Sequence, residues 1–202
     1  MMDFDLTGVG DALLRADKAV SHRLARHRDH PVARTLGWLA EVADQPQLVS
    51  LSIATIAVGG FIGRRDLVRG GTRMLAAEVA ATAAKAVVKR LVERSRPGHA
   101  LETGDDRFRA GDRNDHELTS FPSGHTAGAV AVARAATREI DGIAVPAALA
   151  TAFVAVAQAP SGHHYLGDVA VGAAVGWLAE ALVDRAFGYL DNAPRPSPAM
   201  VA

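Results

Sequence analysis

Long stretches that are almost free of charge dominate the chain from Leu48 onward. Four of them read LVSLSIATIAVGGFIG, MLAAEVAATAAKAVV, IAVPAALATAFVAVAQAP and VAVGAAVGWLAEALV. They are rich in alanine and valine and poor in the residues that punctuate strands, which favours helices. Each is about 15–18 residues long, slightly less than the roughly 20 residues of a straight membrane span. The pattern predicts an all-α fold, a bundle of about five or six helices.

Two environments are compatible with such helices. They can form the core of a soluble alanine-rich bundle, or they can be short membrane helices that pack closely through glycine and alanine. The segments GGFIG and VGAAVG favour the second alternative. The hydrophobic share of 49% is ordinary by itself and does not separate the two.

The distribution of charge also favours the membrane alternative. If the helices alternate across a bilayer, the 98–121 loop, which has more acids than bases, lies on one side. The basic N-terminal segment falls on the opposite side with a group of arginines: Arg64, Arg65, Arg69, Arg73, Arg134, Arg138 and Arg185. This arrangement follows the positive-inside rule. We therefore predict a multi-pass protein of the cell membrane, with the 98–121 loop facing away from the cytoplasm.

Three segments are expected along the chain. Residues 1–30 form a basic, amphipathic N-terminal segment, residues 31–187 a helical domain, and residues 188–202 a proline-rich tail. The first candidate helix, PVARTLGWLAEVADQP, is short and charged and fits an interfacial position. The start of the chain, MMDFDLTGVG, lacks the basic-then-apolar design of a cleaved secretion signal.

Charge and cysteine content narrow the function. The formal net charge of the 202-residue chain is zero, which argues against a nucleic-acid partner. The chain has no cysteine, so disulfides and thiolate metal sites are excluded. No metal-ligand pattern stands out, and we expect neither a metal nor a cofactor. The oligomeric state stays open.

A first polar cluster, KRLVERSRP, follows the second apolar stretch. Lys89 and Arg96 are seven positions apart, so on a helix they share a face, and Lys85 lies one turn earlier. Pro97 is expected to end this helix with Arg96 at its mouth. The cluster is either a snorkelling helix end or a clamp for an anion.

A second cluster, FPSGHTAGAV, has the features of a helix start. Pro122 and Ser123 are expected to begin the helix, and Gly124 lets a ligand approach the backbone. The free amides and the dipole of such an end attract anions. His125 would lie in the first turn and face the ligand, unless it is an ordinary surface histidine.

The third cluster, SGHHYLGDVAVG, contains a second Pro-Ser-Gly-His string and two adjacent histidines. His164 and Asp168 are four positions apart, one helical turn, so they can form a hydrogen bond. A carboxylate that holds an imidazole makes its other nitrogen a better nucleophile or base. His163 points about 100° away on a helix and is the poorer partner.

Taken in order, Lys-x6-Arg-Pro, Pro-Ser-Gly-His and His-x3-Asp resemble the motifs of the type 2 phosphatidic acid phosphatase (PAP2) superfamily. The superfamily includes lipid phosphate phosphatases, undecaprenyl diphosphate phosphatases, bacterial class A acid phosphatases and vanadium haloperoxidases. The resemblance spans about residues 30–185. It makes the first Pro-Ser-Gly-His string the family's second motif, and the second string incidental.

The third motif departs from the family pattern, which reads Ser-Arg-x5-His-x3-Asp. Counting back from His164 places Gln158 where the family has a phosphate-binding arginine, and Ala157 where it has serine. A neutral donor there weakens phosphate affinity and puts full activity in doubt. Arg94 or Lys85 is the candidate for a compensating cation.

The resemblance implies a metal-independent phosphatase that works through a phosphohistidine. His164 would be the nucleophile, Asp168 would orient it, and His125 would act as general acid and then general base. The phosphate would be held by a further set of donors: Lys89, Arg96, Ser123, Gly124 and Gln158.

A site at helix ends in a membrane suits a lipid phosphate substrate. Phosphatidic acid, phosphatidylglycerophosphate and a prenyl phosphate or diphosphate all fit. High alanine, valine and arginine with little lysine is typical of a GC-rich bacterial source. Two alternatives stay open: a membrane binding or structural protein whose catalysis is weakened or lost, and a vanadium haloperoxidase. The short chain and the apolar helices argue against the haloperoxidase.

Overall fold

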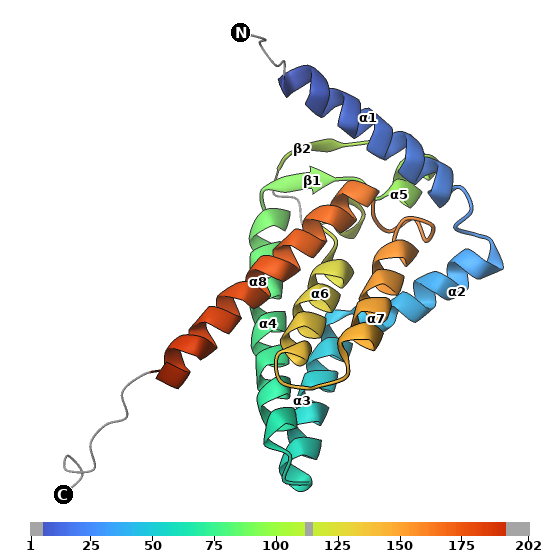
Figure 1. Ribbon diagram of the computed structural model, residues 1–202. Coiled ribbons are helices and arrows are strands. Elements are labelled where there is room, and N and C mark those ends of the chain that lie inside the picture. Colours follow the sequence, from blue (N-terminus) through green and yellow to red (C-terminus); the bar gives the residue numbers. More distant parts are fainter. Residues whose placement is uncertain (1–5, 112–114, 193–202) are drawn as a thin grey trace, which may run out of the picture.

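The computed structural model describes residues 6–111 and 115–192. Within these residues the fold comprises eight α-helices, two short 3-10 helices and one two-stranded antiparallel sheet (Figure 1). The α-helices are α1 Leu6–Ala25, α2 Pro31–Ala40, α3 Gln45–Phe61, α4 Arg65–Lys89, α5 Pro97–Thr103, α6 Gly124–Thr137, α7 Ala144–Ala157 and α8 Leu166–Asn192. The remaining elements are η1 Glu41–Ala43, β1 Val92–Arg94, β2 Phe108–Ala110 and η2 His116–Leu118. The predicted all-α class is confirmed.

Five helices, α3, α4, α6, α7 and α8, form the bundle, in agreement with the expected number. Helix α6 packs against α3, α4, α7 and α8, so it is central (Figure 1). Successive helices of the bundle run in alternating directions, which gives the bundle two ends. We call the end that carries residues 90–111 and 115–123 the loop end, and the opposite end, with the α3–α4 and α6–α7 connections, the far end.

Small residues let the central helices approach closely. A Cβ atom added at Gly176 would lie 2.2 Å from the Ala127 carbonyl oxygen, and one at Gly172 would lie 2.5 Å from that of Ser123. The buried apolar side chains are mainly alanines, among them Ala77, Ala131 and Ala135. Close packing through glycine and alanine is the pattern expected of membrane helices.

The far end is tied together by ion pairs between helices. Glu180 of α8 is buried and accepts from Arg134 and Arg138 of α6, each at 2.8 Å. Arg73 of α4 pairs with Asp184 of α8 at 2.7 Å. Four of the arginines expected to share one side, Arg69, Arg73, Arg134 and Arg138, thus pair with carboxylates that join α4, α6 and α8.

Residues 6–30 of the basic N-terminal segment lie at the loop end, which corrects the expectation that this segment shares a side with the far-end arginines (Figure 1). Lys18 pairs with Asp106 at 2.9 Å, and Arg28 pairs with Glu102 at 2.7 Å. Two bases of this segment are thus partners of acids in the 98–121 loop. Opposite charges bring the two segments together.

One helix of the described residues, α8, is long and apolar enough to cross a membrane by length and composition, and α7 is apolar but shorter. Helix α8 continues to Asn192. The helix thus runs through FGYLDN, past residue 188, where the proline-rich tail was expected to begin. Residues 193–202 of the expected tail lie outside the described residues.

Candidate active site

A polar cavity of about 400 Å³ opens at the loop end of the bundle. Its walls come from η1, the start of α3, the last turns of α4, the segment before α5, η2, the start of α6 and the α7–α8 connection. Almost all of its lining residues are charged or histidine: Glu41, Asp44, Lys85, Lys89, Arg96, His116, Gly124, His125, His163 and His164. The three clusters found in the sequence therefore meet at one place.

Lys89 and Arg96 both line this cavity, although they do not share a helix face as expected. Helix α4 ends at Lys89, and β1 follows because Val92–Arg94 pairs with Phe108–Ala110 of β2. Arg96 is the residue before α5. Backbone oxygens hold both cations: Lys89 Nζ donates to Thr119 at 2.8 Å and Arg96 Nε to His116 at 2.9 Å.

The PSGH string at residues 122–125 begins α6, as predicted. The buried Ser123 is the N-cap, and its Oγ accepts from the Thr126 amide at 3.4 Å. This capping role uses the hydroxyl, and Ser123 is not among the residues that line the cavity. Gly124 and His125 line it, and within the described residues their amides have no backbone acceptor. A Cβ at Gly124 would lie 3.3 Å from Lys85 Nζ.

His125 lies in the first turn of α6 and presents its Nε2 atom to the acidic side of the cavity. This nitrogen is buried and has no hydrogen-bond partner among the described residues. Its closest carboxylate oxygen is Glu41 Oε1, at 3.9 Å. The ring centroids of His125 and His164 are 6.2 Å apart. A small tetrahedral group between the two rings would be in reach of both.

His164 is almost completely buried and precedes α8, which begins at Leu166. Its Nδ1 lies 2.6 Å from the Ser120 carbonyl oxygen, and Asp168 Oδ2 is 3.8 Å away. The expected hydrogen bond between His164 and Asp168 is therefore not formed, because Ser120 takes the Nδ1 proton. This leaves Nε2 as the nitrogen with a free lone pair. Burial lowers the pKa of His164 to about 4, so its ring is neutral at pH 7.

Asp168 is instead the partner of Arg94. Arg94 Nη1 donates to Asp168 Oδ1 at 2.6 Å, and the Tyr165 amide donates to Asp168 Oδ2 at 2.9 Å. Arg94 also binds Asp17 of α1 at 2.7 Å and stacks over the Tyr165 ring at 3.9 Å. Arg94 is buried by these contacts and does not line the cavity. It is not the compensating cation that the sequence suggested.

Gln158 also lies outside the cavity lining. Its side chain is buried and folds back on α7, where Nε2 donates to the Val154 carbonyl at 3.1 Å. Its own backbone oxygen accepts from the amides of His163 and His164 at 3.2 and 3.3 Å. Lys85 lines the cavity, so it is the cation positioned to supply the charge that Gln158 lacks.

His163 lines the same cavity, which the helical projection did not suggest. Residues 158–165 form a turn, so a 100° rotation per residue does not apply to them. Its Nδ1 lies 3.2 Å from Ser161 Oγ, and burial lowers its pKa. The second Pro-Ser-Gly-His string makes this turn: Gly162 has a φ of 77° and its carbonyl accepts from the Gly98 amide at 3.0 Å.

Three lining residues were missed by sequence reasoning: Glu41, Asp44 and His116. The oxygens of Glu41 and Asp44 and a nitrogen of His125 lie within 4.8 Å of one another. Two carboxylates and an imidazole are a possible ligand set for a divalent ion. Glu41 and Asp44 are the first and last residues of the run EVAD, which also contains the buried Ala43. The only signal in the sequence was that this run stands next to a helix start, before Pro46.

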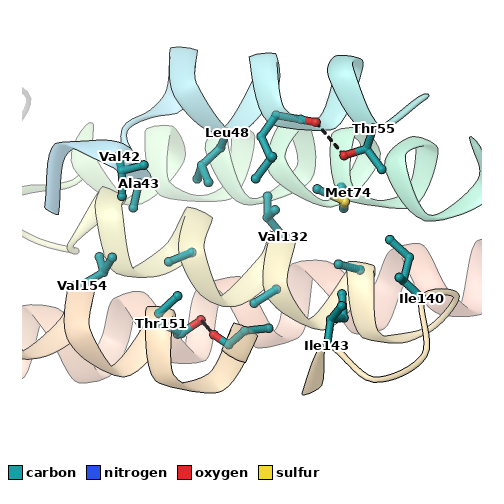
Figure 2. A pocket seen from close by; sticks show the side chains of 16 residues that line it. Val42, Ala43, Leu48, Thr55, Met74, Val132, Ile140, Ile143, Thr151 and Val154 are labelled. Carbon is teal, nitrogen blue, oxygen red and sulfur yellow. Dashed lines mark hydrogen bonds between the residues drawn. The ribbon is translucent and has the colours of Figure 1, made fainter. Parts of the chain in front are cut away.

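The structure also has an apolar cavity of about 350 Å³ (Figure 2). It lies between α3, α6 and α7, with Leu48, Val132 and Val154 among its walls. Val42 and Ala43 line one part of it, directly between Glu41 and Asp44 in the chain, and Ile140 and Ile143 lie nearer the far end. Residues 41–44 therefore contribute to both cavities, Glu41 and Asp44 to the polar one and Val42 and Ala43 to the apolar one.

Comparison with known proteins identifies the family of this chain. The sequence model of the PAP2 superfamily matches residues 70–191, which contain all three motifs and more than half of the chain. The chain belongs to the PAP2 superfamily, which confirms the resemblance drawn from the motifs.

Solved structures show the same fold. A transmembrane PAP2-type phosphatidylglycerolphosphate phosphatase from Bacillus subtilis superposes with a TM-score of 0.66 at 22% identity, over 92% of this chain and 90% of that one. LpxE from Aquifex aeolicus superposes with a TM-score of 0.63 at 22% identity, over 83% and 93%. A search of curated proteins gave no significant match.

Proposed function

We propose that this protein is a metal-independent phosphatase that hydrolyses a lipid phosphate through a phosphohistidine. The observation that carries the proposal is the convergence of His164, His125, Lys89 and Arg96 on one cavity. A buried neutral imidazole supplies a nucleophile, a second imidazole supplies a proton, and the cations hold the phosphoryl oxygens.

In the first step, the Nε2 lone pair of His164 attacks phosphorus. The bond from phosphorus to the leaving oxygen breaks, and that oxygen takes a proton from the imidazolium of His125. The His164 ring becomes a cation because it keeps its Nδ1 proton. The Ser120 carbonyl oxygen at 2.6 Å and the Asp168 carboxylate at 3.8 Å stabilise this cation.

In the second step, the now neutral His125 takes a proton from water. The resulting hydroxide attacks phosphorus, and the phosphorus–nitrogen bond breaks with its electron pair returning to Nε2 of His164. Inorganic phosphate leaves, and both histidines return to their starting protonation states. The same residue acts as acid and then as base, as microscopic reversibility requires.

Charge on the phosphoryl oxygens is matched by Lys85, Lys89 and Arg96, which line the cavity, and by the amides of Gly124 and His125, which have no backbone acceptor among the described residues. Fixed donors of this kind stabilise a phosphoryl transition state without reorganisation. Ser123 contributes by capping α6, which fixes the direction of these amides. Gln158 contributes through its backbone oxygen, which holds the turn that carries His164.

The substrate class follows from the apolar surroundings of the site. Residues 41–44 contribute to both cavities, which supports the apolar cavity as the place of a hydrocarbon chain (Figure 2). The outward faces of α3, α7 and α8 carry exposed large apolar side chains: Leu51, Ile53, Val58, Val145, Leu149, Val156, Leu178 and Leu182. Such surfaces suit a bilayer. These features support a membrane location and a lipid phosphate: phosphatidic acid, phosphatidylglycerophosphate, or a prenyl phosphate or diphosphate.

The test is phosphate release from phosphatidic acid by the purified protein in detergent, with and without EDTA. We expect activity that survives EDTA and is blocked by vanadate. His164→Gln and His125→Gln should each lower kcat by at least about a hundredfold, while His27→Gln, an exposed control, should not. Loss of activity on chelation that a divalent ion restores would exclude the metal-free mechanism.

A second candidate is a family member that binds lipid phosphates but turns them over poorly. It is favoured by the turned-away side chain of Gln158, which leaves the cavity without the family's third-motif arginine. The same assay separates the two, because a binding protein would show vanadate or phosphate protection against unfolding without phosphate release. Bromide oxidation in the presence of vanadate would instead indicate a haloperoxidase.

A further inference from the structure

The polar cavity holds its cations and its carboxylates on different elements. Lys85 and Lys89 come from α4, and Arg96 comes from the segment before α5, whereas Glu41 belongs to η1 and Asp44 precedes α3. Among the residues that the structure describes, no lysine or arginine lies within ion-pair distance of either carboxylate. The cavity therefore keeps two unneutralised acids beside a phosphate site.

These acids lie next to one particular catalytic group. Glu41 Oε1 is 3.9 Å from His125 Nε2, and the donor atoms of Glu41, Asp44 and His125 all lie within 4.8 Å of one another. His164, the proposed nucleophile, is not a member of this group. The acidic pair thus marks the side of the cavity where His125 works.

The position of His125 fixes which part of a substrate meets the acids. In the proposed function, His125 protonates the leaving oxygen, so the leaving group must lie beside His125 and within reach of Glu41 and Asp44. The leaving group of a phosphate monoester is a neutral alcohol. The leaving group of a diphosphate is a lipid monophosphate that carries negative charge. Like charges a few ångströms apart in a partly buried site repel strongly.

We infer that Glu41 and Asp44 are specificity-determining residues that select lipid phosphate monoesters over lipid diphosphates. This inference rests on the proposed function and narrows its substrate class. The carboxylates repel the second phosphate of a diphosphate, and they accept hydrogen bonds from a leaving alcohol that carries hydroxyl or ammonium groups near the ester.

Farnesyl phosphate and farnesyl diphosphate give a matched test, because they share one hydrocarbon chain and differ by one phosphate. We would measure kcat/KM for both, in detergent with EDTA, for the wild type, E41Q, D44N and the double variant. E102Q is the control, since Glu102 is an acid of the same loop end that pairs with Arg28 and does not line the cavity.

We expect the wild type to favour the monophosphate by about tenfold or more, and each single variant to reduce this preference by about fivefold, through faster diphosphate hydrolysis. E102Q should keep the wild-type ratio. The Glu41 side chain is 46% exposed, so E41Q is expected to fold. A wild type that prefers the diphosphate, or variants that change both substrates by the same factor, would overturn the inference.

If the wild type hydrolyses neither farnesyl compound, the selectivity is decided by binding, and the proposed function is contradicted only if phosphatidic acid is not hydrolysed either. Protection against thermal unfolding would be compared for inorganic phosphate and pyrophosphate. If the acids select against a second phosphate, E41Q and D44N should tighten pyrophosphate at least about fivefold more than they tighten phosphate. Equal tightening of both anions would show only a general loss of negative charge and would reject the inference.

Discussion

Arg94 is the residue on which the buried part of the site depends. It is 1% exposed, binds Asp168 and Asp17, and lies between the rings of Tyr165 and Phe108. Arg94→Met would leave the buried Asp168 carboxylate without its cation and would also remove the cation from the partly buried Asp17, a cost of about 3–5 kcal/mol. We expect its melting temperature in detergent to fall by several degrees, and Arg90→Met, at an exposed position nearby, to melt like the wild type. Equal melting temperatures for both variants would show that the clamp does not hold the site.

The histidine at position 164 links stability to pH. Burial lowers its pKa to about 4 in the folded protein, against about 6.5 in an unfolded chain, so between these values only the unfolded state takes up the proton. Stability should therefore fall as the pH is lowered from about 6.5 to 4. His164→Gln should flatten this part of the melting-temperature profile, whereas His27→Gln should leave it unchanged. A profile that is identical for the wild type and His164→Gln would contradict the shift.

At the residue scale, the sequence predicted which side chains line one cavity, but not which groups hold these side chains in place. Lys89, Arg96, Gly124, His125 and His164 all line one cavity, as their motifs indicated. Their immediate partners are backbone oxygens of Thr119, His116 and Ser120, and a backbone acceptor leaves no signature in residue type. Gln158 is a similar case. Its position in the motif suggested a role for the side chain, whereas in the structure its backbone carbonyl holds the turn that carries His164.

At the scale of elements, α1 caps α8 from a distance of about 150 positions in the chain. Asp17 Oδ1 accepts from the Gly167 amide at 2.9 Å, and Ser21 Oγ accepts from the Leu166 amide at 3.0 Å. These are amides of the first turn of α8, which have no acceptor within their own helix. Helix α1 therefore fixes the start of α8 and, through it, the turn that carries His164.

This arrangement predicts that changes in α1 act on the active site. Asp17→Ala removes one cap and one partner of Arg94, and should lower the stability by about 1–3 kcal/mol and kcat with it. Asp11→Ala, an exposed acid of the same helix, is the matched control. Full activity and a normal melting temperature for Asp17→Ala would mean that α1 is only an appendage, as an N-terminal segment separate from residues 31–187 implies.

The elements themselves were predictable where the apolar pattern is long. The four apolar stretches correspond to α3, α4, α7 and α8, and the PSGH string gave the start of α6. The structure between Lys89 and Arg96 was not predictable, since a spacing of seven positions fits two helical turns as well as a turn and a short strand. Only pairing with β2, some 16 residues further along, decides between them. Such non-local contacts also placed α1.

At the scale of the whole molecule, the loop end and the far end of the bundle are the parts that would face the two sides of a membrane. Helix α8, with 27 residues, is about 40 Å long, whereas α6 and α7, with 14 residues each, are about 21 Å. The shorter helices reach across only part of a hydrocarbon core of about 30 Å. We propose that the loop end lies in the head-group region, where a lipid phosphate is found, with its hydrocarbon chain directed along the apolar cavity.

The orientation of the molecule can be measured directly, because the chain has no cysteine of its own. The short far-end connections carry Arg64, Arg65 and Arg138, so we expect the far end to face the cytoplasm and the loop end to face outward. An impermeant maleimide should label Thr103→Cys in intact cells and should label Asp141→Cys only after permeabilisation. The reverse pattern would place the active site on the cytoplasmic side.

A third position separates the orientation from the fold. Arg15→Cys lies on an exposed part of α1, which the structure places at the loop end beside the 98–121 loop. It should therefore be labelled together with Thr103→Cys, whichever way the molecule faces. Labelling of Arg15→Cys together with Asp141→Cys would instead show that the basic N-terminal segment lies at the far end, as the positive-inside rule alone predicts. That result would also remove Asp17 and Ser21 from the start of α8, so it would contradict the cap and the Arg94 clamp in one measurement.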